Sequence, residues 1–213
     1  MFTDFYILQT GLQCSYVRAY NADSMDGTSF HRESTERHLT IIVTVFRKYL
    51  TIEEELQICQ QFHDTWRWDN RVMGSGMLRE YAQEWAYKHD MTTLTTVMGT
   101  LMTLEHPLCL KRQKSDKGWS KYIKGASAVF AWHISRGERV TVLSPPPPER
   151  FHQTGHTNCQ ALKEPIIKGN GCRLRIELVH SMIEGAENFS CQMWPVDEIN
   201  TWIERFGKMV KGT

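Results

Sequence analysis

The sequence lacks any long apolar run. No stretch approaches the roughly 20 apolar residues of a membrane-spanning helix, and the first residues lack the basic start and apolar core of a secretory signal. An excess of one charge is also missing, because 25 Lys and Arg stand against 24 Asp and Glu. No global field therefore attracts nucleic acid or an anionic membrane. We expect a soluble, cytoplasmic chain with no membrane contact.

Paired cysteine motifs and common enzyme signatures are absent as well. The six cysteines are scattered with no C-x-x-C spacing, which favours free or buried thiols over a disulfide framework. The sequence has no Gly-x-Ser-x-Gly elbow, no phosphate-binding glycine loop and no dinucleotide fingerprint. These absences argue against serine hydrolases, P-loop NTPases and dinucleotide-dependent oxidoreductases. The remaining composition, 41% hydrophobic and 23% charged over 213 residues, is typical of a single globular domain, here predicted over 1–213.

Hydrophobic periodicity predicts the strands. The β-branched run 39–46 is bounded by charge and predicts a strand buried on both faces. Alternation of apolar and polar residues predicts two hairpins, formed by 128–134 with 140–143 and by 174–178 with 189–193.

Apolar stripes at helical spacing predict the helices. Thr51 and Glu54 form a capping box, in which each side chain satisfies a backbone amide of the other, so a helix begins there and extends to 66. Similar stripes predict helices over 77–89, 92–104 and 195–206, the last one ending at Gly207.

Three segments carry no regular signal. They are a mobile loop over 21–36, a basic segment over 107–124 and a Pro-rich loop over 144–160. The basic segment holds six Lys and Arg against one Asp, a local charge of +5 (6 − 1). The four prolines after Ser144 cannot donate to a strand ladder and favour a stiff extended connection.

This order of elements predicts an α+β fold. We expect an antiparallel sheet of about five strands packed against three to four amphipathic helices. The order resembles the helix-grip architecture of lipid and polyketide binding proteins and also the dimeric α/β-barrel families. The resemblance concerns element order alone and transfers no functional residue.

The densest group of potential metal ligands is His152, His156 and Cys159. Two imidazoles and a thiolate are ligands that zinc accepts in a tetrahedral site. The spacing matches no established zinc finger, and the alternative interpretation is a solvated loop after the proline run.

His63 and Asp64 form a second candidate site, near Trp66 and Trp68 at the end of the first predicted helix. An acid and an imidazole against aromatic walls are suited to general acid/base catalysis, because desolvation tunes both pKa values. Adjacent helix positions point about 100° apart, so the spacing alone predicts no close dyad. The alternative is a plain aromatic core.

Two strand histidines are further candidates. His180 follows the predicted strand 174–178 on the parity of its buried residues, so it would project inward near the mouth of a cavity and orient a ligand carbonyl or hydroxyl. His133 is predicted on the opposite face of its strand from Phe130 and Trp132. The alternative for either residue is a structurally satisfied histidine.

The leading hypothesis is a protein that binds a small apolar ligand and catalyses a cofactor-free isomerisation, cyclisation or hydration. The catalytic candidates are His63, Asp64 and His180, no organic cofactor is implied, and a homodimer is left open. The competing hypothesis is a non-enzymatic interaction module. In that case the basic segment 111–124, with Trp119 and Tyr122, would contact nucleic acid, or the Pro-rich loop would dock on a protein partner. The neutral charge of the whole chain favours a solvated segment over nucleic-acid binding.

Overall fold

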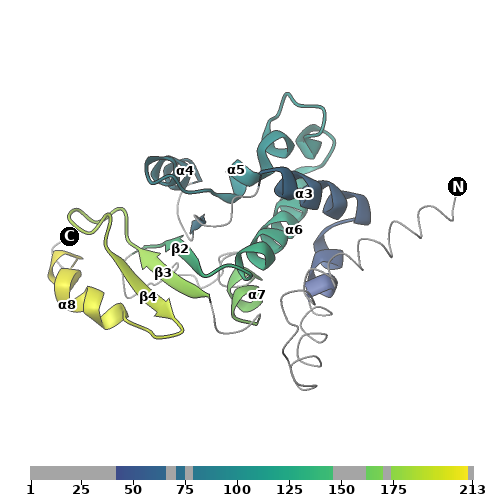
Figure 1. Cartoon of the computed structure of the whole chain (residues 1–213). Coiled ribbons are helices and arrows are strands. Elements are labelled where there is room, and N and C mark those ends of the chain that lie inside the picture. The colour runs from purple at the N-terminus through teal and green to yellow at the C-terminus, as the bar shows by residue number, and fades with distance from the viewer. Residues whose placement is uncertain (1–41, 66–70, 75–78, 146–161, 170–173, 211–213) are drawn as a thin grey trace, which may run out of the picture. The chain divides into compact units, whose positions relative to one another are not determined.

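The computed structural model describes residues 42–65, 71–74, 79–145, 162–169 and 174–210. All of them belong to one compact unit, Ile41–Thr213 (Figure 1). The predicted loop 21–36 and all but the first two residues of the predicted Pro-rich loop lie outside this part of the chain.

Four strands form one mixed sheet in the described residues. They are β1 (Val72–Gly74), β2 (Arg139–Leu143), β3 (Arg175–Val179) and β4 (Ser190–Trp194), and they lie in that order. The first three strands pair in parallel, and β3 pairs with β4 in the antiparallel direction. Parallel neighbours need long crossover connections, which here contain helices.

This pairing corrects the predicted antiparallel sheet of five strands. Of the two predicted hairpins, the one of 174–178 with 189–193 is confirmed, as β3 and β4. The predicted strand 140–143 is also present, as β2, but it pairs with β1 and β3 in parallel and not with 128–134. Apolar alternation reports which face of a strand is buried and carries no information on the direction of its neighbours. The resemblance to helix-grip and dimeric α/β-barrel proteins depended on the predicted order of elements, and this order changes because residues 42–49 and 128–134 are helical.

The helices account for most of the remaining described residues. Residues 42–49 are helical, and the labelled α-helices are α3 (Ile52–Thr65), α4 (Arg79–Lys88), α5 (Leu94–Met98), α6 (Asp116–Ile134), α7 (Glu164–Gly169) and α8 (Ile199–Val210). Two short 3-10 helices are η1 (Gly99–Met102) and η2 (Leu110–Arg112). None of the helices described is both long enough and apolar enough to cross a membrane.

The helix predicted from Thr51 is confirmed together with its capping box. The Thr51 amide donates to Glu54 Oε2 at 3.0 Å, and the Glu54 amide donates to Thr51 Oγ1 at 3.2 Å. The predicted helix 77–89 is confirmed as α4, and the predicted helix 92–104 is confirmed as α5 followed by η1. The last helix starts later than predicted, at Ile199, and continues through Gly207.

Two predicted strands, 39–46 and 128–134, are wrong, because their described residues, from 42 onward in the first, are helical. Within 42–49, Ile42 and Phe46 are buried while Val43 is 40% exposed, which is helical spacing. The segment 128–134 belongs to α6, where neighbouring residues are buried in succession. A fully buried apolar run has no distinct period, so alternation by eye cannot separate a strand from a helix there.

The helix 42–49 and α3 both pack on α6. The ring of Phe46 lies edge-on to that of Trp132 at 6.5 Å, and Phe62 of α3 lies edge-on to Phe130 at 6.2 Å. Gly125 of α6 lies against Leu50: a Cβ added at Gly125 would be 2.3 Å from Leu50 Cγ. This close approach requires glycine at that position.

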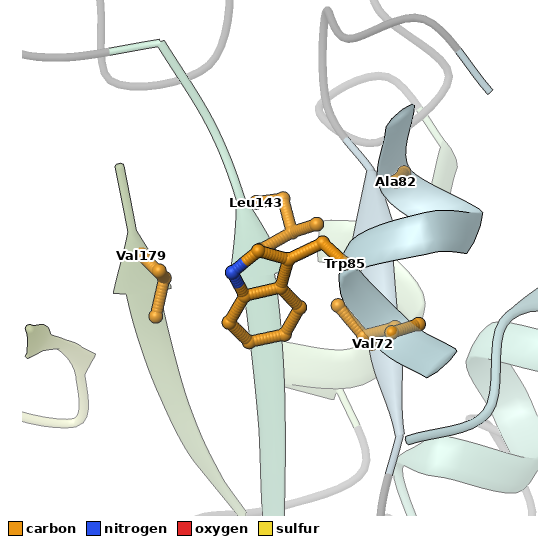
Figure 2. Packing of buried hydrophobic residues seen from close by; sticks show 6 residues of the cluster. Val72, Ala82, Trp85, Leu143 and Val179 are labelled. Carbon is orange, nitrogen blue, oxygen red and sulfur yellow. The ribbon is translucent and has the colours of Figure 1, made fainter. Parts of the chain in front are cut away.

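The sheet is buried on both faces. On one face, Trp85 of α4 packs over Val72, Leu143 and Val179, one from each parallel strand (Figure 2). The residues next to them in β2 and β3, such as Val142 and Leu178, point to the opposite face and are also buried. Helix α8 packs beside β4 (Figure 1). Burial on both faces is typical of parallel sheets.

Candidate functional site at the carboxyl ends of the parallel strands

Polar residues follow β2 and β3 at the edge where both strands end. Ser144 follows β2, and His180 and Ser181 follow β3. The Ser144 amide donates to the Val179 carbonyl at 3.1 Å, and the His180 Nδ1–H donates to the Ser144 carbonyl at 3.0 Å. The carboxyl edge of parallel strands is the usual place for ligands in α/β sheets, so a ligand site is expected at this junction.

The His180 ring has a defined tautomer and no exposed surface. A carbonyl oxygen only accepts hydrogen bonds, so Nδ1 carries the proton and Nε2 presents its lone pair. Burial lowers the pKa of His180, although backbone carbonyls at Ser144 and Pro145 act in the opposite direction. The imidazole is therefore neutral near pH 7, with Nε2 available as a hydrogen-bond acceptor.

His180 and two residues beside it carry buried polar atoms without a partner. Neither His180 Nε2, nor Ser181 Oγ, nor Trp202 Nε1 has a hydrogen-bond partner among the described residues. The Trp202 ring, from α8, lies at 4.6 Å from the His180 ring and is inclined to it at 73°. An unsatisfied buried polar atom costs about 1–3 kcal/mol, so such a group in a native protein calls for an explanation.

Helix α4 also contacts this edge. The Tyr81 hydroxyl donates to the Ser181 carbonyl at 2.9 Å, while Trp85, one turn later, covers the adjacent sheet face (Figure 2). Side chains from α4 and α8 thus surround the residues that follow β3. The arrangement offers one acceptor, one hydroxyl and one donor beside aromatic rings, which suits recognition of a largely apolar molecule with a polar group.

His63 and Asp64 lie in the last turn of α3. Their side chains meet, with His63 Nδ1 at 3.3 Å from Asp64 Oδ1, and they are 85% and 59% exposed. Hydrogen bonds from Gln60 and then His63 lower the pKa of Asp64. Both side chains are thus largely in contact with solvent, and the described residues do not provide the desolvated environment that was expected from the sequence to tune their pKa values. Trp66 and Trp68 lie outside the described residues, and a catalytic role for the pair stays a prediction.

The candidate zinc ligands His152, His156 and Cys159 lie outside the part of the chain that the structure describes. Within that part, no three or more His, Cys, Asp or Glu side chains are grouped so as to hold a metal ion. Zinc binding by these three residues therefore stays a prediction.

His133 lies in α6, so its predicted place on a strand is wrong. It packs edge-on against Phe62 with ring centroids 5.6 Å apart. Burial, and to a smaller extent the positive charges of Arg136 and Arg71, lower the pKa of His133 to about 3. The residue is neutral and belongs to the contact between α3 and α6.

The basic segment is largely helical, as η2 and the first half of α6. Lys111 pairs with Asp116 at 2.7 Å, and Lys114 pairs with Glu54 of α3. The rings of Trp119 and Tyr122 stack on each other at 5.3 Å, with these same two lysines above them. The aromatic residues that were expected to stack on bases are therefore engaged within the protein.

One open hollow of about 430 Å³ lies on the outer side of α4. Its lining consists of Arg79, Glu80, Gln83, Glu84, Tyr87 and Thr95. Neither His63 nor His180 lines it, so it is not the enclosed ligand cavity that the leading hypothesis expects.

Sequence reasoning placed His180 at the end of its strand but missed its neighbours. Ser144, Ser181, Tyr81 and Trp202 were not among the candidates. Ser144 directly follows the predicted strand 140–143, and His180 lies two residues after the predicted strand 174–178. This similar position at two strand ends was a usable signal. Grouping them required knowing that the two strands run parallel.

Comparison with known protein families, with curated protein sequences and with solved structures finds no match to this chain.

Proposed function

We propose that this protein binds a small, largely apolar molecule at the carboxyl ends of β2 and β3, and that His180 recognises it. The observation that carries the proposal is the buried Nε2 of His180. Its ring is oriented by the bond from Nδ1 to the Ser144 carbonyl, and Nε2 has no partner in the described part of the chain. A hydrogen-bond donor of the ligand would satisfy it.

The surroundings define the chemistry of the ligand. A neutral Nε2 accepts, so the ligand must present a hydroxyl or an amide N–H, and Trp202 supplies an aromatic wall. Because His180 has no exposed surface, a ligand reaches Nε2 only when this edge opens. Binding is therefore coupled to a local conformational change. Cofactor-free isomerisation, cyclisation or hydration would use the same nitrogen as a general base.

A thermal-shift screen tests the proposal. The screen compares small apolar alcohols and amides with ethers and esters of matched shape that lack a donor. Binding at about 100 times the Kd stabilises the folded state by about 2.7 kcal/mol, and only compounds with a donor should reach this level. The shift should disappear in His180→Phe and persist in His63→Phe, since His63 is exposed.

A second measurement keeps the test valid if His180→Phe does not fold. In the wild-type protein, the ¹⁵N resonance of His180 Nε2 should move when a hit is added, because the nitrogen gains a hydrogen-bond donor. Hits that leave this resonance unchanged, or that stabilise His180→Phe as much as the wild type, would contradict a site at His180.

A further inference from the structure

The first half of α6 presents a row of lysines to solvent. Lys117, Lys121 and Lys124 are spaced four and three residues apart, which places them on one side of the helix. Lys117 and Lys121 are exposed and Lys124 is partly exposed. The row spans seven residue steps, about 10 Å along the helix axis at about 1.5 Å each.

The carboxylates near this row are already paired with other cations. Asp116 pairs with Lys111, Glu54 pairs with Lys114, and Glu55 pairs with Arg47. In the described part of the chain, Lys117, Lys121 and Lys124 have no ion-pair partner. The chain is nearly neutral as a whole, so the positive charge of this row is a local feature.

We infer that this lysine row binds the phosphodiester backbone of nucleic acid. One strand of a duplex carries a phosphate about every 3.4 Å along the axis, so a row of about 10 Å matches about three phosphates. Lysine contacts to phosphate carry no sequence information, and binding is therefore independent of base sequence. This activity does not depend on the site at His180.

Two observations favour a phosphate backbone over a lipid surface. A helix that binds a membrane surface turns its apolar side to the lipid. In α6 that side is covered by protein, because Tyr122, Ala126 and Phe130 are buried. Between the lysines Ser120 is exposed, and the large apolar side chains of Trp119 and Ile123 are only partly exposed. The fully exposed residues of this row are therefore polar or charged, and a charged helix side is sufficient for phosphate contacts.

The number of phosphate contacts determines how strongly the affinity depends on salt. Each neutralised phosphate of B-DNA contributes about −0.9 to the slope of log K against log salt, so three contacts give a slope of about −2.7. The affinity should then fall about 40-fold between about 50 and 200 mM salt.

Fluorescence anisotropy with a labelled duplex of about 20 base pairs measures this slope. The test variant is Lys117→Gln/Lys121→Gln/Lys124→Gln, and the charge-matched control is Lys88→Gln/Arg139→Gln/Lys208→Gln, three exposed cations on other elements. The test variant should lose most of the slope, and the control should keep it. A third variant with arginine at the three lysine positions should also keep it, which separates lost charge from lost folding.

Several outcomes would overturn the inference. They are no duplex binding by the wild type at about 50 mM salt, equal slopes for the wild type and the test variant, and equal losses in the test and control variants. Binding to phosphatidylserine vesicles with the same lysine dependence but without duplex binding would assign the row to a membrane surface instead.

Discussion

Replacing Gly125 with alanine should destabilise the protein even though it places a better helix former in the middle of α6. Alanine is favoured over glycine in a helix interior by about 1 kcal/mol. Here the added Cβ would lie 2.3 Å from Cγ and 2.4 Å from Cδ2 of Leu50. Leu50 is 5% exposed and its amide donates to the Phe46 carbonyl at 2.8 Å, so it cannot move away freely.

The expected loss is the difference between these two effects. Overpacking of this kind costs about 1–3 kcal/mol. After the gain in helix propensity, Gly125→Ala should lower the free energy of unfolding by about 1–2 kcal/mol. In a Leu50→Ala background the clash is absent, so the same substitution should raise the free energy of unfolding by about 1 kcal/mol. The wild type, the two single variants and the double variant form a double-mutant cycle, and the predicted change of sign within it isolates the contact of Gly125 with Leu50.

Urea unfolding of the four proteins in the cycle measures both changes. Gly207→Ala in α8 is a matched control: its Cβ would meet only the side chain of Ile203, at 3.3 Å, and Ile203 is 44% exposed. The control should raise stability by up to about 1 kcal/mol. If Gly125→Ala stabilised the wild type as the control does, Leu50 would not lie against Gly125, and the packing of helix 42–49 on α6 would be wrong.

Two further predictions concern pH and the start of α3. The pKa of His133 is about 3 in the folded protein and about 6.5 when unfolded, so only the unfolded state takes up a proton between these values. This contribution to stability is complete above about pH 6.5 and is lost as the pH falls toward about 3, by at most about 1.4 kcal/mol per pH unit; urea unfolding from pH 7 to pH 4 should show this slope, reduced in His133→Phe. An equal slope in that variant would place the proton uptake elsewhere. Thr51→Ala removes the hydroxyl that accepts from the Glu54 amide and should cost about 1 kcal/mol of unfolding free energy, whereas Thr51→Ser should cost little; equal stability of the two variants would show that the cap contributes nothing.

Elements that are specified by residues close together in the sequence were predicted correctly. The capping box at Thr51 lies within one turn, and it starts a helix as expected. The alternation in 174–178 and its antiparallel partner produces β3 and β4, because one face is buried and a short connection returns the chain. The capping bonds form within a few residues, so neighbours in sequence are sufficient to specify them.

Elements whose signal depends on distant partners were predicted incorrectly. Residues 42–49 and 128–134 are rich in β-branched or apolar residues, yet both are helical because each packs on the other, as the contact of Phe46 with Trp132 shows. Tertiary packing outweighs the β propensity of the residues, which is small for each one. The strand β1 is three residues long and too short for any periodic signal.

Some features of the candidate site were likewise predictable from the sequence, and others depend on the tertiary structure. The sequence by itself determined that His180 follows a strand on its buried parity, and that the basic segment concentrates positive charge. Only the tertiary structure decided that β2 and β3 run parallel, which brings the Ser144 carbonyl to His180 Nδ1. It also decided which lysines pair with carboxylates and which stay unpaired among the described residues. The physical reason is that strand direction and ion pairing depend on residues far apart in the chain, and a linear pattern does not contain their distances.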